Sequence, residues 1–105
     1  MALSYRDILD KFATKRLAVV GDSMVDEGIM DDDYVVVKPA MTVENGQIGV
    51  VLLDDEATVK KIYIQRDKIA LKPANKQVGY KTQYLRRGSK NIRIVGKVIG
   101  CFRKI

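Results

Sequence analysis

Histidine is absent from this chain of 105 residues, and cysteine occurs only once, as Cys101. Without histidine no Ser-His-Asp triad can form, so any serine nucleophile in this chain would need a different base. A single cysteine excludes an intramolecular disulfide and fits a reducing cytosol. The sequence also lacks zinc-ligand spacing, and we predict neither a metal nor another cofactor.

Long apolar runs are missing as well. No stretch approaches the roughly 18 residues that a membrane-spanning helix needs, and no signal peptide opens the chain. The sequence therefore predicts a soluble, cytoplasmic protein without membrane contact. Hydrophobic residues make up 47% of the chain, which is enough for one ordered domain with its own core.

The formal net charge is +6, and it is unevenly distributed. Acidic residues gather in residues 22–56, whereas residues 60–104 carry most of the lysine and arginine. A basic excess is compatible with nucleic acid or an acidic partner. No stacking-aromatic motif or helix-turn-helix pattern accompanies it, however. We interpret the charge as a solvated basic face and predict no direct DNA binding by this chain.

One short helix is predicted near the N-terminus, over residues 4–13. Ser4 can cap it, and Asp7 stands three residues later, as in a capping box. Leu9 and Phe12 would form its apolar stripe.

The rest of the chain predicts a mostly β protein, built as compact antiparallel sheets or a partly open barrel. Hairpin tips are expected at residues 54–56 and 65–68, and a long surface loop with a short internal strand at residues 73–91. The predicted strands are Leu17–Val20, Tyr34–Lys38, Ile48–Leu53, Ala57–Gln65, Ile69–Lys72, Ile92–Val95 and Val98–Arg103.

A serine on a glycine-led turn is the first candidate for chemistry, in the run Val20-Gly21-Asp22-Ser23-Met24. A neutral hydroxyl is a poor nucleophile until a base accepts its proton. Backbone N–H groups at such a turn could stabilise a tetrahedral oxyanion by about 3 kcal/mol per donor. Ser23 is therefore a candidate nucleophile.

A lysine 37 residues further on, Lys60, is the candidate base. Lysine can accept a proton at moderate pH only if burial lowers its pKa. On a strand Thr58 and Lys60 share one face while Lys61 lies on the other, so one lysine can be buried and its neighbour solvated.

Simpler interpretations of these residues stay open. Gly-Asp-Ser is a common turn sequence in which serine usually serves as a cap. Lysine pairs on strands are usually solvated, or they protect a sheet edge from aggregation. Met24 could border a cleft or simply fill the core.

Six segments, in order, resemble the catalytic domain of LexA-type repressors, the self-cleaving group that includes UmuD-like proteins. The resemblance covers most of the chain from Val19 onward. The segments are Gly21–Met24, Gly28–Asp33, Asn45-Gly46, Asp54–Lys61, Leu71–Asn75 and Gly96–Gly100.

This resemblance implies a serine endopeptidase with a Ser–Lys dyad. Ser23 would be the nucleophile and Lys60 the general base. Asp22, Met24 and Thr58 would line the oxyanion site or the cleft, with Thr58 bonded near the lysine amine. The family cuts an Ala-Gly or Cys-Gly bond in a peptide segment of the repressor, stimulated by the RecA–single-stranded-DNA filament during the SOS response to DNA damage. It also implies a homodimer, with Val98–Arg103 at or near the interface.

Two departures from the family stand out. Asp31-Asp32-Asp33 replaces the usual Asp-Gly-Asp, and we expect the turn to persist because aspartate tolerates a left-handed conformation. No Ala-Gly or Cys-Gly dipeptide occurs in the chain, and only 22 residues precede Ser23. We expect residues 1–16 to be a helical segment of unassigned role and residues 17–105 the peptidase and dimerisation domain. The expectation is a chain with no cleavage site or DNA-binding domain of its own, either a fragment or a relative acting in trans.

Two other functions are compatible with the sequence. One is a non-enzymatic dimerisation or interaction module, such as an UmuD-like partner of a translesion polymerase. The other is a signal-peptidase-like enzyme, which also uses a Gly-x-Ser-Met turn and a lysine. The lack of a membrane anchor disfavours the latter, as does Val25, which does not lead into the expected proline.

Overall fold

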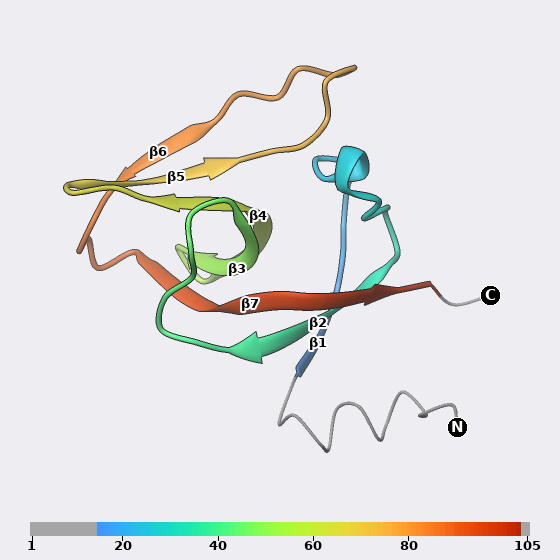
Figure 1. Cartoon of the computed structure of the whole chain (residues 1–105), viewed down its shortest axis with the longest axis horizontal. Coiled ribbons are helices and arrows are strands. Elements are labelled where there is room, and N and C mark those ends of the chain that lie inside the picture. The colour runs from blue at the N-terminus through green and yellow to red at the C-terminus, as the bar shows by residue number, and fades with distance from the viewer. Residues whose placement is uncertain (1–14, 104–105) are drawn as a thin grey trace.

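The computed structural model describes residues 15–103, which form seven strands and one turn of 3-10 helix (Figure 1). The helix predicted over residues 4–13 lies outside the described residues, and no α-helix occurs within them. The elements are β1 (Lys15–Ala18), η1 (Val25–Glu27), β2 (Tyr34–Pro39), β3 (Gln47–Leu53), β4 (Glu56–Ile64), β5 (Lys68–Lys72), β6 (Gln83–Arg86) and β7 (Ile92–Phe102).

All seven strands belong to one antiparallel sheet in the order β1-β2-β7-β3-β4-β5-β6. The predicted mostly β, antiparallel architecture is confirmed. The strands form a single sheet rather than several, and it does not close into a barrel, because β1 and β6 each pair on one side only. In Figure 1, β4, β5 and β6 lie above β3, while β7, β2 and β1 lie below it.

The last strand differs from the prediction. Two strands were expected on either side of Gly96, but β7 runs without interruption from Ile92 to Phe102. Gly96 lies within the ladder, and glycine is required there because the backbone of β2 is close. A Cβ at this position would lie 2.2 Å from the carbonyl oxygen of Lys38. Glycine inside a strand often marks such an approach or a bulge rather than a strand end. The ladder to β3 is irregular next to Gly96, between Val50 and Val51, and the ladder to β2 is irregular further along β7, where Val36 pairs with Gly100 and Val37 with Val98.

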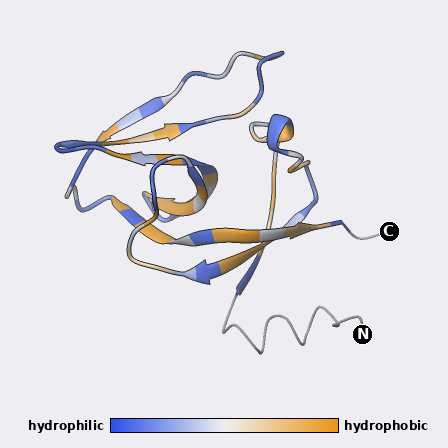
Figure 2. Cartoon of the chain, viewed as in Figure 1, coloured by the Kyte–Doolittle hydropathy of each residue, from blue (hydrophilic) through white to orange (hydrophobic). Residues whose placement is uncertain are grey.

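Alternation along the central strands divides the core into two clusters on opposite faces of the sheet. Val50 and Val59 pack into the first cluster, while Val51 and Ile62 pack into the second. Figure 2 shows the hydrophobic residues concentrated along β3, β5 and β7, with hydrophilic turns between them. The first cluster underlies the segment that follows β1, and it therefore supports the candidate site.

Three aspartates adopt the left-handed conformation that tight turns need. Asp54 and Asp55 have φ of 49° and 67° at the β3–β4 hairpin, where a tip was predicted. Asp32 has φ of 71°, so the turn expected at Asp31-Asp32-Asp33 is present without the glycine. The predicted short strand within residues 73–91 is β6.

Candidate active site

Ser23 lies on a turn between β1 and η1. Gly21 has φ of 94°, a conformation that a residue with a Cβ rarely adopts, and its N–H donates to Asp31 Oδ1 at 2.7 Å. β1 ends at Ala18, two residues earlier than predicted, but Val19 still exchanges backbone hydrogen bonds with the Asp31–Asp33 turn. These contacts hold the serine turn against the start of β2.

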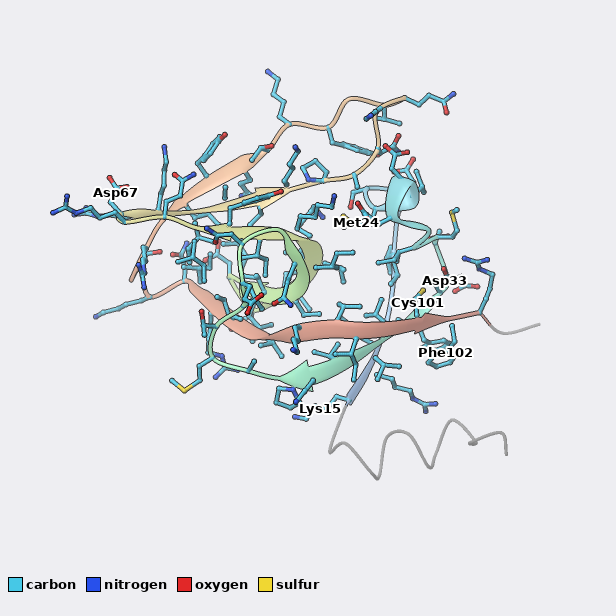
Figure 3. All side chains as sticks on the ribbon, viewed as in Figure 1. Lys15, Met24, Asp33, Asp67, Cys101 and Phe102 are labelled. Atoms are coloured by element: carbon cyan, nitrogen blue, oxygen red, sulfur yellow. The ribbon has the colours of Figure 1, made fainter. Side chains whose placement is uncertain are left out.

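The buried side chain of Met24, the residue after Ser23, anchors the serine turn to the core. Met24 is only 2% exposed and packs into the first core cluster, so it is a core residue that also borders the cleft beside Ser23. Figure 3 shows its side chain directed inward from the turn. Burying such a side chain contributes about 1.5–3 kcal/mol, which fixes the backbone on which Ser23 stands.

The segment after β5 forms a second anchor that the sequence analysis did not identify. Ala74 N–H donates to Ser23 O at 2.7 Å, and Asn75 Nδ2 donates to Asp22 O at 2.9 Å. Asn75 is 8% exposed, and its Oδ1 accepts from the N–H of Val78. Its place in Leu71–Asn75, one of the segments that resemble the family, was the only signal in the sequence, because its partner Asp22 lies 53 residues away.

Lys60, on β4, reaches the serine. Its Nζ lies 2.9 Å from Ser23 Oγ, 3.0 Å from Thr58 Oγ1 and 3.1 Å from the carbonyl oxygen of Val59. No carboxylate lies within ion-pair distance of Lys60 among residues 15–103. Burial without a counter-charge disfavours the ammonium and lowers the pKa of Lys60 below its ordinary value. Three of the five predicted site residues, Ser23, Thr58 and Lys60, therefore lie together.

Lys61 points elsewhere, as strand alternation requires. It forms an ion pair with Glu27 of η1, and this hydrogen-bonded carboxylate raises the pKa of Lys61. Of the two adjacent lysines, Lys60 has its pKa lowered and Lys61 has its pKa raised.

Two hollows flank the Ser23–Lys60 pair. A narrow cleft of about 120 Å³ runs between residues 17–20 and residues 57–60, and its walls are mostly apolar. A wider hollow of about 320 Å³ lies on the other side, bordered by Val20, Asp22 and Tyr80. Tyr80 donates its hydroxyl to Asp22 Oδ1 at 2.5 Å, and this bond raises the pKa of Tyr80. Asp22, predicted to line the site, thus lines the wider hollow while its backbone supports the turn.

An ion pair between buried Asp33 and the exposed side chain of Arg103 lies at the far end of the serine-bearing segment. Asp33 is 0% exposed, and Arg103 donates hydrogen bonds to both of its carboxylate oxygens, from Nε at 2.6 Å and from an Nη at 2.8 Å. These bonds, together with one from Met30 N–H, hold the pKa of Asp33 well below its usual range. Figure 3 shows Asp33 beside Cys101 near the end of β7. The sequence analysis did not find this cluster, because its members are far apart in the chain.

Residues 15–103 contain no group of three or more histidine, cysteine, aspartate or glutamate side chains placed to hold a metal ion. Nor does any helix in this part of the chain have the length and apolar character to cross a membrane.

Comparison with known proteins agrees with this geometry. A LexA repressor from Acetivibrio thermocellus is 48% identical over 99 residues, which cover 94% of this chain and 44% of that protein. A LexA repressor from Pseudothermotoga lettingae is 47% identical over 88 residues, covering 83% of this chain and 42% of the relative. The chain therefore spans less than half the length of these curated relatives. A family model described as Peptidase S24-like matches residues 3–99, and the chain belongs to that family.

Proposed function

We propose that this chain is the catalytic domain of a LexA-type repressor or a close relative, and that Ser23 and Lys60 form its Ser–Lys dyad. The observation that carries the proposal is the 2.9 Å separation between Lys60 Nζ and Ser23 Oγ in a partly buried site without a counter-ion. A hydroxyl and an uncharged amine at this distance meet the requirement for an activated nucleophile.

The three oxygen partners of Lys60 can accommodate a neutral amine as well as an ammonium. The neutral amine has two N–H donors, and Thr58 Oγ1 and the Val59 carbonyl oxygen lie at 3.0 and 3.1 Å to accept them. Its lone pair is then directed to the hydroxyl of Ser23. As Oγ attacks a peptide carbonyl, Lys60 takes the proton and later passes it to the leaving amine, while the acyl group stays on Ser23 until water releases it. Thr58 acts here as a positioning residue.

Donors for the oxyanion are available on the serine turn. The backbone N–H groups of Ser23 and Met24 donate no hydrogen bond to any acceptor within residues 15–103. Paired N–H groups beside a nucleophile stabilise a tetrahedral oxyanion, and each contributes roughly 3 kcal/mol. This role depends on the backbone of Ser23 and Met24, whose position the buried methionine fixes.

An extended peptide is the substrate form that the sheet favours. β5 pairs with β4 only from Lys61 to Ile64, so β4 has an open edge over residues 56–60, next to the dyad. A strand edge binds extended peptides through main-chain hydrogen bonds. We propose that a segment with an Ala-Gly-like bond binds there. No Ala-Gly or Cys-Gly bond occurs in this sequence, so the substrate segment comes from outside these 105 residues.

The proposed partners follow from the same family. We propose a cytoplasmic homodimer whose cleavage is stimulated by the RecA–single-stranded-DNA filament. The edge of β7 that faces away from β2 supports dimerisation, since residues 98–101 have no strand neighbour on that side within the described chain. A second β7 edge would complete the pairing.

The test is cleavage in trans. The purified chain is incubated from neutral to alkaline pH with a LexA-type repressor whose own nucleophile is removed, and mass spectrometry locates the cut. We expect one cut at an Ala-Gly or Cys-Gly bond, which Ser23→Ala abolishes. A folded, dimeric chain that makes no cut with this substrate, or a cut that survives Ser23→Ala, would refute the proposal and favour the non-enzymatic interaction module.

A further inference from the structure

Acidic residues occur only before residue 68, whereas basic residues are concentrated after it. Residues 68–105 hold eleven of the 19 lysines and arginines and none of the 13 acidic residues. The proposed dyad uses none of these basic residues. Charge asymmetry between the two parts of a chain is typical of proteins with a polyanionic partner.

Strand pairing gathers part of this charge on one face of the sheet. Lys68 pairs with Arg86, and Ala70 pairs with Tyr84 on one side and with Tyr63 on the other. Paired residues lie on the same face, so these side chains project together, and Lys72 joins them two residues along β5. We call the surface formed by Tyr63, Lys68, Lys72, Tyr84 and Arg86 the basic tyrosine face. Lys61, which pairs with Lys72, borders it and is held in the ion pair with Glu27.

The opposite face of the same strands is core. Ile69, Leu71 and Leu85 pack into the second hydrophobic cluster, which fixes the register and leaves the basic tyrosine face outward. Tyr84 is 62% exposed, and Lys68 Nζ lies 5.1 Å from the centre of its ring. The ring of Tyr84 is therefore open to solvent, whereas Tyr63 is half-buried beside Gly46.

The spacing on this face suits stacked bases. Tyr63 and Tyr84 stand two strands apart, roughly 9–10 Å, with the small residue Ala70 between them. β5 and β6 contain no carboxylate. Asp67 lies at the tip of the β4–β5 turn in Figure 3, and Glu27 is paired with Lys61. The face thus combines open aromatic surface with three cations: Lys68, Lys72 and Arg86.

We propose that the basic tyrosine face binds single-stranded nucleic acid. Phosphates would lie along Lys68, Lys72 and Arg86, and bases would stack on Tyr84 and Tyr63, the combination that sequence-tolerant single-strand binders use. An acidic peptide would satisfy the cations but not the aromatic rings. This proposal departs from the prediction, made from the sequence, that the chain does not bind DNA directly. The sequence does not show that the two tyrosines lie on one face, because only strand pairing brings them together. It does not depend on the proposed dyad.

The aromatic part is tested by fluorescence anisotropy with a labelled twenty-nucleotide oligothymidine at low salt. Wild type, Tyr84→Phe and Tyr84→Leu are compared in the full chain. Loss of a stacked ring weakens binding by roughly tenfold or more, so Tyr84→Leu should bind that much more weakly while Tyr84→Phe keeps wild-type affinity. Equal affinity of all three proteins would overturn the proposal.

The electrostatic part needs a matched charge control. Lys68→Glu and Lys38→Glu change the net charge equally, but Lys38 lies exposed on β2, outside the basic tyrosine face. We expect Lys68→Glu to weaken binding far more than Lys38→Glu. With three phosphate contacts, the logarithm of the affinity should fall with a slope of roughly −2 against log salt, and Lys68→Glu should make this slope shallower.

Three outcomes would refute the proposal. Equal losses in Lys68→Glu and Lys38→Glu would mean attraction to net charge alone. A duplex bound as tightly as the single strand, with no effect of Tyr84→Leu, would mean phosphate contact without stacking. Polyglutamate competing as well as oligothymidine would identify an acidic protein as the partner. Ser23→Ala should leave binding unchanged, which separates this site from the dyad.

Discussion

The side-chain amines of Lys60 and Lys61, neighbours in the chain, occupy opposite electrostatic environments. Lys60 Nζ lies 2.9 Å from Ser23 Oγ with no carboxylate nearby in the described chain, and burial lowers its pKa. Lys61 is paired with Glu27, which raises its pKa. Because successive side chains of a strand point to opposite faces, one step along β4 separates a candidate base from a lysine whose charged form is stabilised by Glu27.

This contrast predicts a clear difference between two single substitutions. Lys60→Ala removes the proton acceptor of Ser23 and should slow cleavage in trans by roughly 10²–10⁴-fold or more. Lys61→Ala removes a partly exposed ion pair, worth about 0–1 kcal/mol, and should leave the rate within a small factor of wild type. Rates are measured with the same repressor substrate, and circular dichroism verifies folding. Equal losses in both variants would mean that the lysines have been assigned to the wrong faces.

The pH dependence follows from the direction of the Lys60 pKa. The amine accepts a proton only when neutral, so the cleavage rate should rise with pH and level off above its pKa. Burial lowers that pKa, and the midpoint should therefore lie below the ordinary lysine value of 10.5. A rate profile from pH 6 to pH 11 tests this, with saturating substrate at each point. A midpoint at or above the ordinary value would contradict a desolvated base.

Asn75 should matter to both stability and rate. Asn75→Ala leaves Asp22 O and the Val78 N–H without their partners, a loss of about 1–3 kcal/mol. Because Asp22 O belongs to the serine turn, cleavage should also slow by roughly 10- to 100-fold. Urea unfolding and cleavage rates are measured together. Asn91→Ala, an exposed asparagine, is the control and should change stability by less than about 0.5 kcal/mol.

Asp33 should make the protein sensitive to acid. Its pKa is lowered in the folded state by Arg103, so its contribution to stability is complete above its ordinary value of 3.8 and is lost as pH falls through the lower folded value. Asp33→Asn should lower the melting temperature at neutral pH and flatten the decline in acid. Asp32→Asn, next to it but exposed, should do neither. Identical acid profiles for the two variants would show that the pair with Arg103 contributes no pH-dependent stability.

Much of the fold was accessible to sequence reasoning. Alternating apolar residues with turn residues between them located β1 to β5 to within about two residues, because side-chain alternation is a local property of strands. β6 was predicted only as a short strand somewhere within residues 73–91. β7 was predicted as two strands, Ile92–Val95 and Val98–Arg103, with Gly96 and Lys97 between them. The close approach of the Lys38 carbonyl, which requires glycine there, comes from a strand more than 50 residues away in the sequence.

The candidate site, like the fold, was predicted only in part from the sequence. Ser23 and Lys60 were found from residue chemistry and from resemblance to a family, and their hydrogen bond agrees with that pairing. Asn75 and the Asp33–Arg103 pair were missed. Each has its effect through backbone or side-chain partners distant in sequence, so no local pattern points to it.

The sequence by itself determined the strands, the glycine-led serine turn and the choice of lysine over histidine as a candidate base, since these depend on residue type and local periodicity. Only the tertiary structure decided how closely Lys60 approaches Ser23, what anchors the serine turn and which tyrosines share a face. These depend on strand order and register, and register sets which side chains meet, because a shift of one residue turns every side chain of a strand to the other face.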